Sequence, residues 1–380
     1  ASRAVGVVSN LLSARESDGY LAGIKAEYVK VREAHVRNEA KKTRITVAAA
    51  RANRPKIKWE GYTPPRPTFL GARAFKSYDL ATLVAYVDWT PFFQTWELAG
   101  RYPAILDDDK VGTEARKLFA DAQAMLQRLV AEKWLTANGV VGFWPANAAG
   151  DDIQVWKDDR RKARLATLFT LRQQIARDAG RNRAHTALAD FVAPTETGLA
   201  DYVGTFAVTT GIGEEAALER HLATTDDYGR IILKALADRL AEAFAEALHA
   251  RVRRELWGYA KAEKLSYDDL IAEKYVGIRP APGYPAQPDH TEKATLWQLM
   301  DVERSAGITL TESFAMWPGS SVSGLYFSHP ESHYFGVGKV ERDQVEDYAR
   351  RKGWCVAEAE RWLAPVLNYD PVAAAAEDAA

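Results

Sequence analysis

The chain of 380 residues contains a single cysteine, Cys355. It therefore cannot form a disulfide within itself. Metal or iron–sulfur clusters held by several cysteines of this chain alone are also excluded. Such sparing use of cysteine fits a reducing compartment, so we expect a cytoplasmic protein.

Excess charge of either sign is also lacking. The formal net charge is −1, which gives no electrostatic reason to expect nucleic acid or a membrane surface as a partner. The longest apolar runs are far shorter than the roughly 20 residues that a membrane-spanning helix needs.

Apolar and aromatic residues are plentiful. Hydrophobic residues make up 47% of the chain and charged residues 27%, which is typical of a soluble globular protein. Eleven tryptophans and sixteen tyrosines indicate a large aromatic core or a stacking site. The length allows one large domain or two ordinary ones.

The stretch from Arg279 to His290 carries four prolines in twelve residues. Each proline removes a backbone donor and biases the preceding residue toward an extended conformation, so a helix is excluded. Gly283 allows a turn or a close approach to a ligand. Arg279 offers a planar fork of donors suited to a carboxylate. The ordinary interpretation is a rigid connection between two helices; the alternative is a stiff binding loop.

This stretch, RPAPGYPAQPDHTEK, closely resembles the signature of the activation domain of cobalamin-dependent methionine synthase. Four further stretches resemble the same family: residues 88–93 (DWTPFF), 237–244 (ADRLAEAF), 313–319 (SFAMWPG) and 326–330 (YFSHP). The resemblance implies a domain that binds S-adenosylmethionine (AdoMet) and supports reductive remethylation of cob(II)alamin. The chain departs from the family at Gln287, where cysteine is usual. A thiol role is excluded there, whereas a backbone contact would survive.

The resemblance also implies a domain organisation. Residues 1–14 would be the tail of a preceding cobalamin-binding domain, 15–56 a helical linker and domain start, 57–370 the AdoMet-binding domain, and 371–380 a disordered tail. The family places the domain start in the thirties, although the proline-rich stretch 55–67 is the more obvious physical boundary. Because Ala1 begins inside a helical pattern, we expect a fragment of a longer protein.

Apolar periodicity and turn signals predict the elements. We expect helices at Gly19–Glu39, Thr46–Ala52, a start at Thr90-Pro91, Thr113–Glu132, Asp226–Tyr259, Tyr267–Glu273, Thr291–Val302, Arg342–Lys352 and Val356–Leu363. We expect strands at Phe69–Tyr78, a hairpin within 140–156, Leu188–Val192, Tyr202–Val208, Ile308–Phe314, Val322–Phe327 and Tyr334–Val340. Without βαβ alternation, this order predicts an α+β fold. It would have a mixed or antiparallel sheet packed with long helices, as a single large domain preceded by a short helical linker.

The resemblance assigns an AdoMet site to seven residues: Asp88, Glu242, Arg279, Ala281, Tyr284, Tyr334 and Phe335. It associates Asp238 with the cobalamin-domain contact. Without the resemblance, Asp88 would be read as a capping carboxylate, Asp238 and Glu242 as an exposed acidic face, and Tyr334-Phe335 as a core pair. Carboxylates and aromatic faces suit the sulfonium and ammonium of AdoMet. A sulfonium methyl is already activated, so we expect no catalytic base.

Two further patterns point elsewhere. Residues 211–216 match the glycine fingerprint of dinucleotide-binding folds, but Glu214 and Glu215 would repel phosphates. A turn before an acidic helix start is the better interpretation. His290, His329 and His333 have no carboxylate or cysteine at ligand spacing, so we expect no metal.

Three functions stay open. The first is the AdoMet-binding reactivation module of a methyltransferase in methionine biosynthesis. Its partners would be the cobalamin-binding domain of the same chain and a flavodoxin-type or reductase electron donor. The second is an AdoMet-sensing and donor-docking module without methyl transfer. The third is a nucleotide-dependent oxidoreductase, which binding of AdoMet against NADH would separate from the other two.

Overall fold

The structure is a computed structural model that describes residues 2–39, 44–175 and 184–371. Its contacts divide the chain into two compact units, each described by itself. The first unit contains two helices, α1 (Ser2–Leu12) and α2 (Ser17–Glu39). The second begins at Thr46 and contains all the other elements. The predicted disordered tail, residues 371–380, lies outside the described residues apart from residue 371.

Helices of the second unit that precede the long helix are short, apart from α6. They are α3 (Val47–Ala52), α4 (Leu80–Leu83), α5 (Thr90–Thr95), α6 (Gly112–Ala131) and α7 (Glu214–His221). The later ones are α8 (Asp227–Arg251), α9 (Tyr267–Ile271), α10 (Glu292–Met300), α11 (Val302–Ala306), α12 (Arg342–Lys352) and α13 (Val356–Leu363). Short 3₁₀ turns lie at Val84–Tyr86, Ala104–Asp107, Leu188–Phe191, Thr195–Thr197 and Ala364–Val366, and a π turn at Val252–Leu256. No helix among the described residues is both long and apolar enough to cross a membrane.

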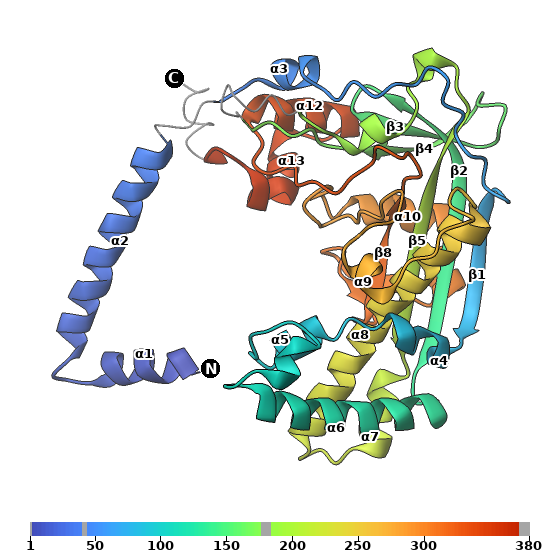
Figure 1. Cartoon of the computed structure of the whole chain (residues 1–380). Coiled ribbons are helices and arrows are strands. Elements are labelled where there is room, and N and C mark those ends of the chain that lie inside the picture. The colour runs from blue at the N-terminus through green and yellow to red at the C-terminus, as the bar shows by residue number, and fades with distance from the viewer. Residues whose placement is uncertain (1, 40–43, 176–183, 372–380) are drawn as a thin grey trace. The chain divides into compact units, whose positions relative to one another are not determined.

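A six-stranded antiparallel sheet forms the centre of this unit (Figure 1). Its strands are β1 (Gly71–Tyr78), β2 (Thr136–Ala149), β3 (Asp152–Trp156), β4 (Arg164–Phe169), β5 (Asp201–Ile212) and β8 (Ser321–Tyr326). The order is β4-β3-β2-β5-β8, and β1 pairs with the first half of β2 beyond the end of β3. Strands β6 (Thr309–Leu310) and β7 (Met316–Trp317) make a separate small hairpin. The predicted α+β class with an antiparallel sheet is confirmed.

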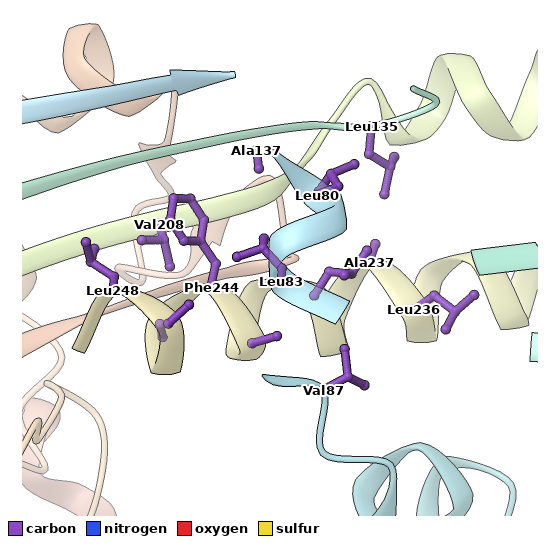
Figure 2. Packing of buried hydrophobic residues seen from close by; sticks show 14 of the residues in the cluster. Leu80, Leu83, Val87, Leu135, Ala137, Val208, Leu236, Ala237, Phe244 and Leu248 are labelled. Carbon is purple, nitrogen blue, oxygen red and sulfur yellow. The ribbon is translucent and has the colours of Figure 1, made fainter. Parts of the chain in front are cut away.

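Both faces of the central strands are buried, because side chains alternate between two cores. On β2, Val141 and Phe143 face the core under α8, whereas Val140 and Trp144 face the core under α10 and α11. Figure 2 shows the first core, where Phe244 and Leu248 of α8 lie against Val208 of β5. The sheet is therefore sandwiched between the long helix and the later short ones.

A third core joins the C-terminal helices to the segment that follows the sheet. It is built from Leu171, Val337, Val340, Val345, Tyr348, Ala349, Ala359, Leu363 and Leu367. The two helices predicted here, α12 and α13, have the predicted bounds. The N-terminal edge of the unit is attached to α12, because the Val47 N–H donates to Asp343 and the Arg51 guanidinium bonds Asp347.

Two strand predictions are wrong, and a third strand is shorter than predicted. Leu188–Phe191 is a 3₁₀ turn, because the Asp190 carboxylate accepts the Ala187 N–H at 2.8 Å and pairs with buried Arg172. Tyr334–Val340 joins no strand of the sheet, and Gly338 within it has a positive φ of 73°. In the predicted strand Ile308–Phe314, two residues pair, as β6. Short apolar runs do not by themselves distinguish strands from buried turns.

The long predicted helix ends earlier than expected. Asp226 caps α8 by accepting the Gly229 N–H at 2.8 Å, as its position before the apolar repeat predicts. The helix ends at Arg251 and passes into the π turn, and Gly258 then adopts a positive φ of 78°. The apolar repeat of α8 continues into this turn, since Val252 and Leu256 are also buried, so periodicity alone overestimates the helix.

A buried ammonium links the end of the proline-rich stretch to α12. The Lys352 Nζ lies 2.7 Å from oxygens of Asp289, Thr291 and Glu292. Tyr348 and Thr291 also donate to Asp289, and the pKa of Asp289 is lowered, since Lys352 and these donors outweigh its burial. Burial raises the pKa of Glu292 to about 7, against an ordinary value of 4.5, although Lys352 opposes the shift. One cation serves two buried carboxylates, and Glu292 is the one whose pKa is raised.

This arrangement predicts a pH-dependent stability. The pKa of Glu292 is raised in the folded state. The contribution of this carboxyl to the free energy of unfolding is therefore fully present below its unfolded pKa and is lost as pH rises through about 7. Glu292→Gln should remove that dependence, so the stability difference between wild type and variant should change between about pH 5 and about pH 8. Urea unfolding at a series of pH values measures it. Exposed Glu303→Gln is the control, and a difference that does not vary with pH would contradict the assignment.

Candidate functional site

The proline-rich stretch is an ordered, non-helical loop, as predicted. Gly283 has a φ of 94°, and its N–H donates to the Gln287 carbonyl at 2.7 Å. A Cβ at this position would lie 2.3 Å from Cε1 of His290, so a side chain would displace the His290 ring as well as adopt a φ that L residues rarely take. The Tyr284 N–H donates to the Ala281 carbonyl at 3.1 Å and tightens the same turn.

Carbonyls of the prolines attach the loop on two sides. The Leu325 N–H of β8 donates to the Pro280 carbonyl, and the Val337 N–H donates to the Pro285 carbonyl, both at 2.8 Å. This second bond places the segment 334–340 beside the loop, and a loop rich in proline has few N–H groups with which to continue a ladder. The loop is thus fixed by the backbone on both flanks.

A cavity of about 480 Å³ opens between this loop, β5, α8 and the segment 334–335. Its lining residues are Phe206, Glu242, Glu273, Arg279, Pro280, Ala281, Tyr284, Pro285, Ala286, Val322, Tyr334 and Phe335. Six of the seven residues assigned by resemblance are therefore brought together: Glu242, Arg279, Ala281, Tyr284, Tyr334 and Phe335. Such a volume suits a small organic ligand.

Asp88 is the seventh, and it does not line this cavity. Its Oδ1 accepts the Thr90 N–H at 2.9 Å, so it caps the start of α5. The helix starts at Thr90, as predicted, and the Thr90 hydroxyl accepts the Tyr102 N–H. The contact that Asp88 makes in the structure is therefore the one expected of a capping carboxylate.

Arg279 is held at both its backbone and its side chain. Its N–H donates to the Tyr334 hydroxyl at 3.0 Å, and its Nη1 lies 2.5 Å from Oε2 of Glu246 on α8. The Nδ1 of His249 is 3.4 Å from the same Nη1. Burial opposes the positive charge, but Glu246 outweighs it, and the pKa of Arg279 is raised above its ordinary value.

Three polar residues beneath the cavity, Glu246, His249 and Arg253, were not predicted from the sequence. With the predicted Glu242 they recur at spacings of four, three and four; Glu242, Glu246 and His249 lie on one side of α8, and Arg253 follows in the π turn. Glu246 has 14% of its side chain exposed, and Arg253 and His249 are fully buried. Polar residues at helical spacing within an otherwise apolar helix were the signal that would have found them.

Charge is distributed unevenly around the cavity. Burial raises the pKa of Glu242, with Arg239 and Arg279 opposing the shift. Burial also raises the pKa of Glu273, which Arg279 likewise opposes. Burial lowers the pKa of His249 strongly, and Arg253 and Arg279 lower it further, so the ring is neutral and can accept a bond from Arg279. The cavity therefore offers one guanidinium and two carboxylates to a ligand that carries both signs of charge.

The glycine fingerprint lies at a different place. Residues Gly211 to Ala216 connect β5 to α7 and line a second cavity of about 540 Å³ with Lys234, Gly307, Trp317 and Ser320. Strand β5 pairs antiparallel with both β2 and β8, so the parallel βαβ unit of a dinucleotide fold is not formed by these strands. Glu214 accepts a hydrogen bond from Ser320, in keeping with a turn before an acidic helix start.

The three histidines considered as metal ligands lie in different surroundings. His290 contacts Lys293, with 2.8 Å between Nδ1 and Nζ. His329 packs between the rings of Trp59 and Tyr62, and His333 lies edge-on to Phe191. Among the described residues, no three His, Cys, Asp or Glu side chains are grouped to hold a metal ion.

Gln287 points away from the cavity. Its side chain is buried and its Nε2 donates to the Phe169 carbonyl at 2.5 Å, whereas its backbone carbonyl completes the Gly283 turn. The position where the family usually has cysteine therefore supports the loop from behind.

The chain was compared with known proteins. The family model described as "Vitamin B12 dependent methionine synthase, activation domain" matches residues 79–353. A solved structure described as the crystal structure of the MetH reactivation domain bound to AdoHcy is 56% identical in sequence. It superposes with a TM-score of 0.82, and the match covers 86% of this chain and 99% of that chain.

The geometry of Gln287 predicts the effect of restoring cysteine. Gln287→Cys should lower the free energy of unfolding by about 1 kcal/mol, because the Phe169 carbonyl loses its donor. Affinity for a ligand in the cavity should change less than about twofold, a free-energy change well below 1 kcal/mol. Urea unfolding and AdoMet titration measure the two effects, with exposed Gln94→Cys as the control for an added thiol. A tenfold change in affinity would show that the side chain reaches the ligand.

Proposed function

The chain belongs to the family of vitamin B12-dependent methionine synthase activation domains, and we propose that its cavity binds AdoMet for reductive remethylation of cob(II)alamin. One observation carries the proposal: the loop, α8 and the segment 334–335 bring one guanidinium, carboxylates and aromatic side chains into a single cavity. The neighbour that was solved with AdoHcy supports it, since AdoHcy is AdoMet without the transferred methyl group.

Each part of AdoMet has a counterpart in the cavity. Arg279 pairs with the ligand carboxylate, because a guanidinium matches its two oxygens. Glu242 and Glu273 face the ammonium and the sulfonium. Tyr334 and Phe335, with the backbone around Ala281 and Tyr284, provide aromatic and polar contacts to the nucleoside. Asp88 enters the proposed site through the resemblance alone.

The role of the chain itself in the reaction is to position AdoMet. The sulfonium methyl needs no further activation, so no side chain has to move a proton. Cobalamin, held by the neighbouring domain, supplies the nucleophilic cobalt once an electron donor has reduced it. Arg279 holds the carboxylate, and Glu242 and Glu273 face the ammonium and the sulfonium, so the amino-acid end and the sulfonium of AdoMet are positioned together in the cavity. We place this activity in the cytoplasm, within methionine biosynthesis.

A second candidate keeps AdoMet binding without methyl transfer. In that case the chain would sense AdoMet and dock a flavodoxin-type or reductase donor. Exposed Tyr284, with 58% of its surface accessible, and Trp317, also 58%, are apolar surfaces that a partner would cover. Neither version predicts that the chain alone makes methionine from homocysteine and methyltetrahydrofolate.

Binding to Arg279 is testable by substitution. Arg279→Lys should weaken AdoMet binding almost as much as Arg279→Ala, because an ammonium cannot copy the two-pronged donor. The loss should be about tenfold to a few hundredfold, since charge-assisted hydrogen bonds contribute about 1.5–3 kcal/mol. Titration calorimetry measures it, with thermal melts for the fold and exposed Arg304→Lys as the control. If Lys binds like Arg, the residue acts only through its charge.

Methyl transfer separates the two candidates. The chain, mixed with a separately supplied cobalamin-binding domain, AdoMet and a chemical reductant, should methylate the cobalamin in a single turnover. The absorption spectrum of cobalamin measures the product, and Arg279→Ala should slow the transfer at sub-saturating AdoMet. Tight AdoMet binding without any methylation would favour the docking module.

A further inference from the structure

We propose that Glu246 is a positioning residue that orients the Arg279 guanidinium before the ligand arrives, so that the cavity selects ligands with an α-carboxylate. The inference rests on the proposed function, because it concerns the same cavity. Glu246 does not line the cavity itself and acts through Arg279.

First, one nitrogen of the Arg279 guanidinium is occupied by protein partners. Oε2 of Glu246 and Nδ1 of His249 both contact Nη1 of Arg279, at 2.5 and 3.4 Å. Within the described part of the chain, Nη1 is the one guanidinium nitrogen of Arg279 for which a hydrogen bond is found. Nε and Nη2 form the adjacent edge of the planar fork, and this edge is left for the two oxygens of a carboxylate.

The second step is what holds Glu246 in place. Its Oε1 lies 3.8 Å from Nη1 of Arg253, which is fully buried. Arg253 is in turn fixed by Glu263, whose oxygens are 2.9 Å from Nε, and by the ring of Tyr275 at 4.4 Å. Arg253 is therefore a buried cation beside Oε1 of Glu246, while Oε2 contacts Arg279.

The third step closes the network at the backbone. The Tyr275 hydroxyl lies 3.0 Å from the Tyr334 hydroxyl, which accepts the Arg279 N–H at 3.0 Å. Arg279 is thus fixed at its N–H by one branch of the network and at its guanidinium by the other, and Arg253 contacts both branches. A long side chain that is held before binding loses less rotamer freedom when the ligand arrives.

Orientation and charge have opposite effects here, which makes the proposal testable. The negative charge of Glu246 competes with the ligand carboxylate for Arg279, whereas its oxygen fixes the fork. Glu246→Gln keeps an acceptor for Nη1 and removes the charge, so AdoMet affinity should stay within about threefold of wild type or improve. Glu246→Ala removes both, and affinity should fall about tenfold.

The experiment is calorimetric titration of the 380-residue chain with AdoMet and with 5′-methylthioadenosine, which has the sulfur and nucleoside but no carboxylate. Glu246→Ala should weaken AdoMet and leave 5′-methylthioadenosine unchanged. In the Arg279→Ala background it should have no further effect on AdoMet. Glu255→Ala, which removes a surface partner of Arg251 on the same stretch, is the matched control and should bind both ligands like wild type.

Several outcomes would overturn the inference. Equal weakening of both ligands would make Glu246 a structural support for the whole cavity. Tighter AdoMet binding in both Glu246→Ala and Glu246→Gln would make it a competing charge only. If Glu246→Ala does not fold, Glu246→Asp is the second variant. The shorter side chain draws the carboxylate back from Nη1 of Arg279 and keeps its charge near Arg253. Unchanged AdoMet affinity in Glu246→Asp would overturn the inference.

Failure of the inference can be told from failure of the proposed function. Wild type that binds neither nucleoside would overturn both. Wild type that binds AdoMet, together with a folded Glu246→Ala variant of unchanged affinity, would overturn the role of Glu246 alone.

Discussion

The rigidity of the proline-rich loop is the constraint on which the rest of the site depends. Its conformation is fixed by three independent attachments: β8 bonds the Pro280 carbonyl, Val337 bonds the Pro285 carbonyl, and Lys352 binds Asp289 at its end. Proline removes alternative conformations from the unfolded chain as well, so less entropy is lost when the loop orders. A backbone fixed in this way holds Arg279 and Tyr284 in position before the ligand binds.

Charge separation around the cavity follows from which elements supply each group. The loop supplies the cation Arg279, whereas α8 supplies Glu242 and Glu246, one helical turn apart. Like charges at that spacing would repel on an isolated helix. Here Oε2 of Glu246 contacts Arg279 and Oε1 lies 3.8 Å from Arg253, so the charge of Glu246 is compensated within the protein. Glu242 is left nearer the ligand space, where its raised pKa reflects burial beside other carboxylates.

Local patterns predicted much of the fold and part of the site. The bounds of α12 and α13 and the hairpin of β2 and β3 follow from periodicity and turn residues. The turn at Leu188–Phe191 could not be predicted, because its conformation depends on Arg172, a residue distant in sequence and buried beside Asp190. The site residues were assigned by resemblance. Their convergence, and the partnership of Glu246 with Arg279, are tertiary facts that no single stretch encodes.

A crystal structure of the chain with AdoMet bound tests the central claim most directly. The account predicts ligand density in the cavity between the loop and α8, with the ligand carboxylate on Nε and Nη2 of Arg279 and Nη1 still on Glu246. The sulfonium should lie on the side of Glu242 and Glu273. Density in the second cavity beside Gly213 and Trp317 would contradict the account, as would a carboxylate that displaces Glu246 from Nη1.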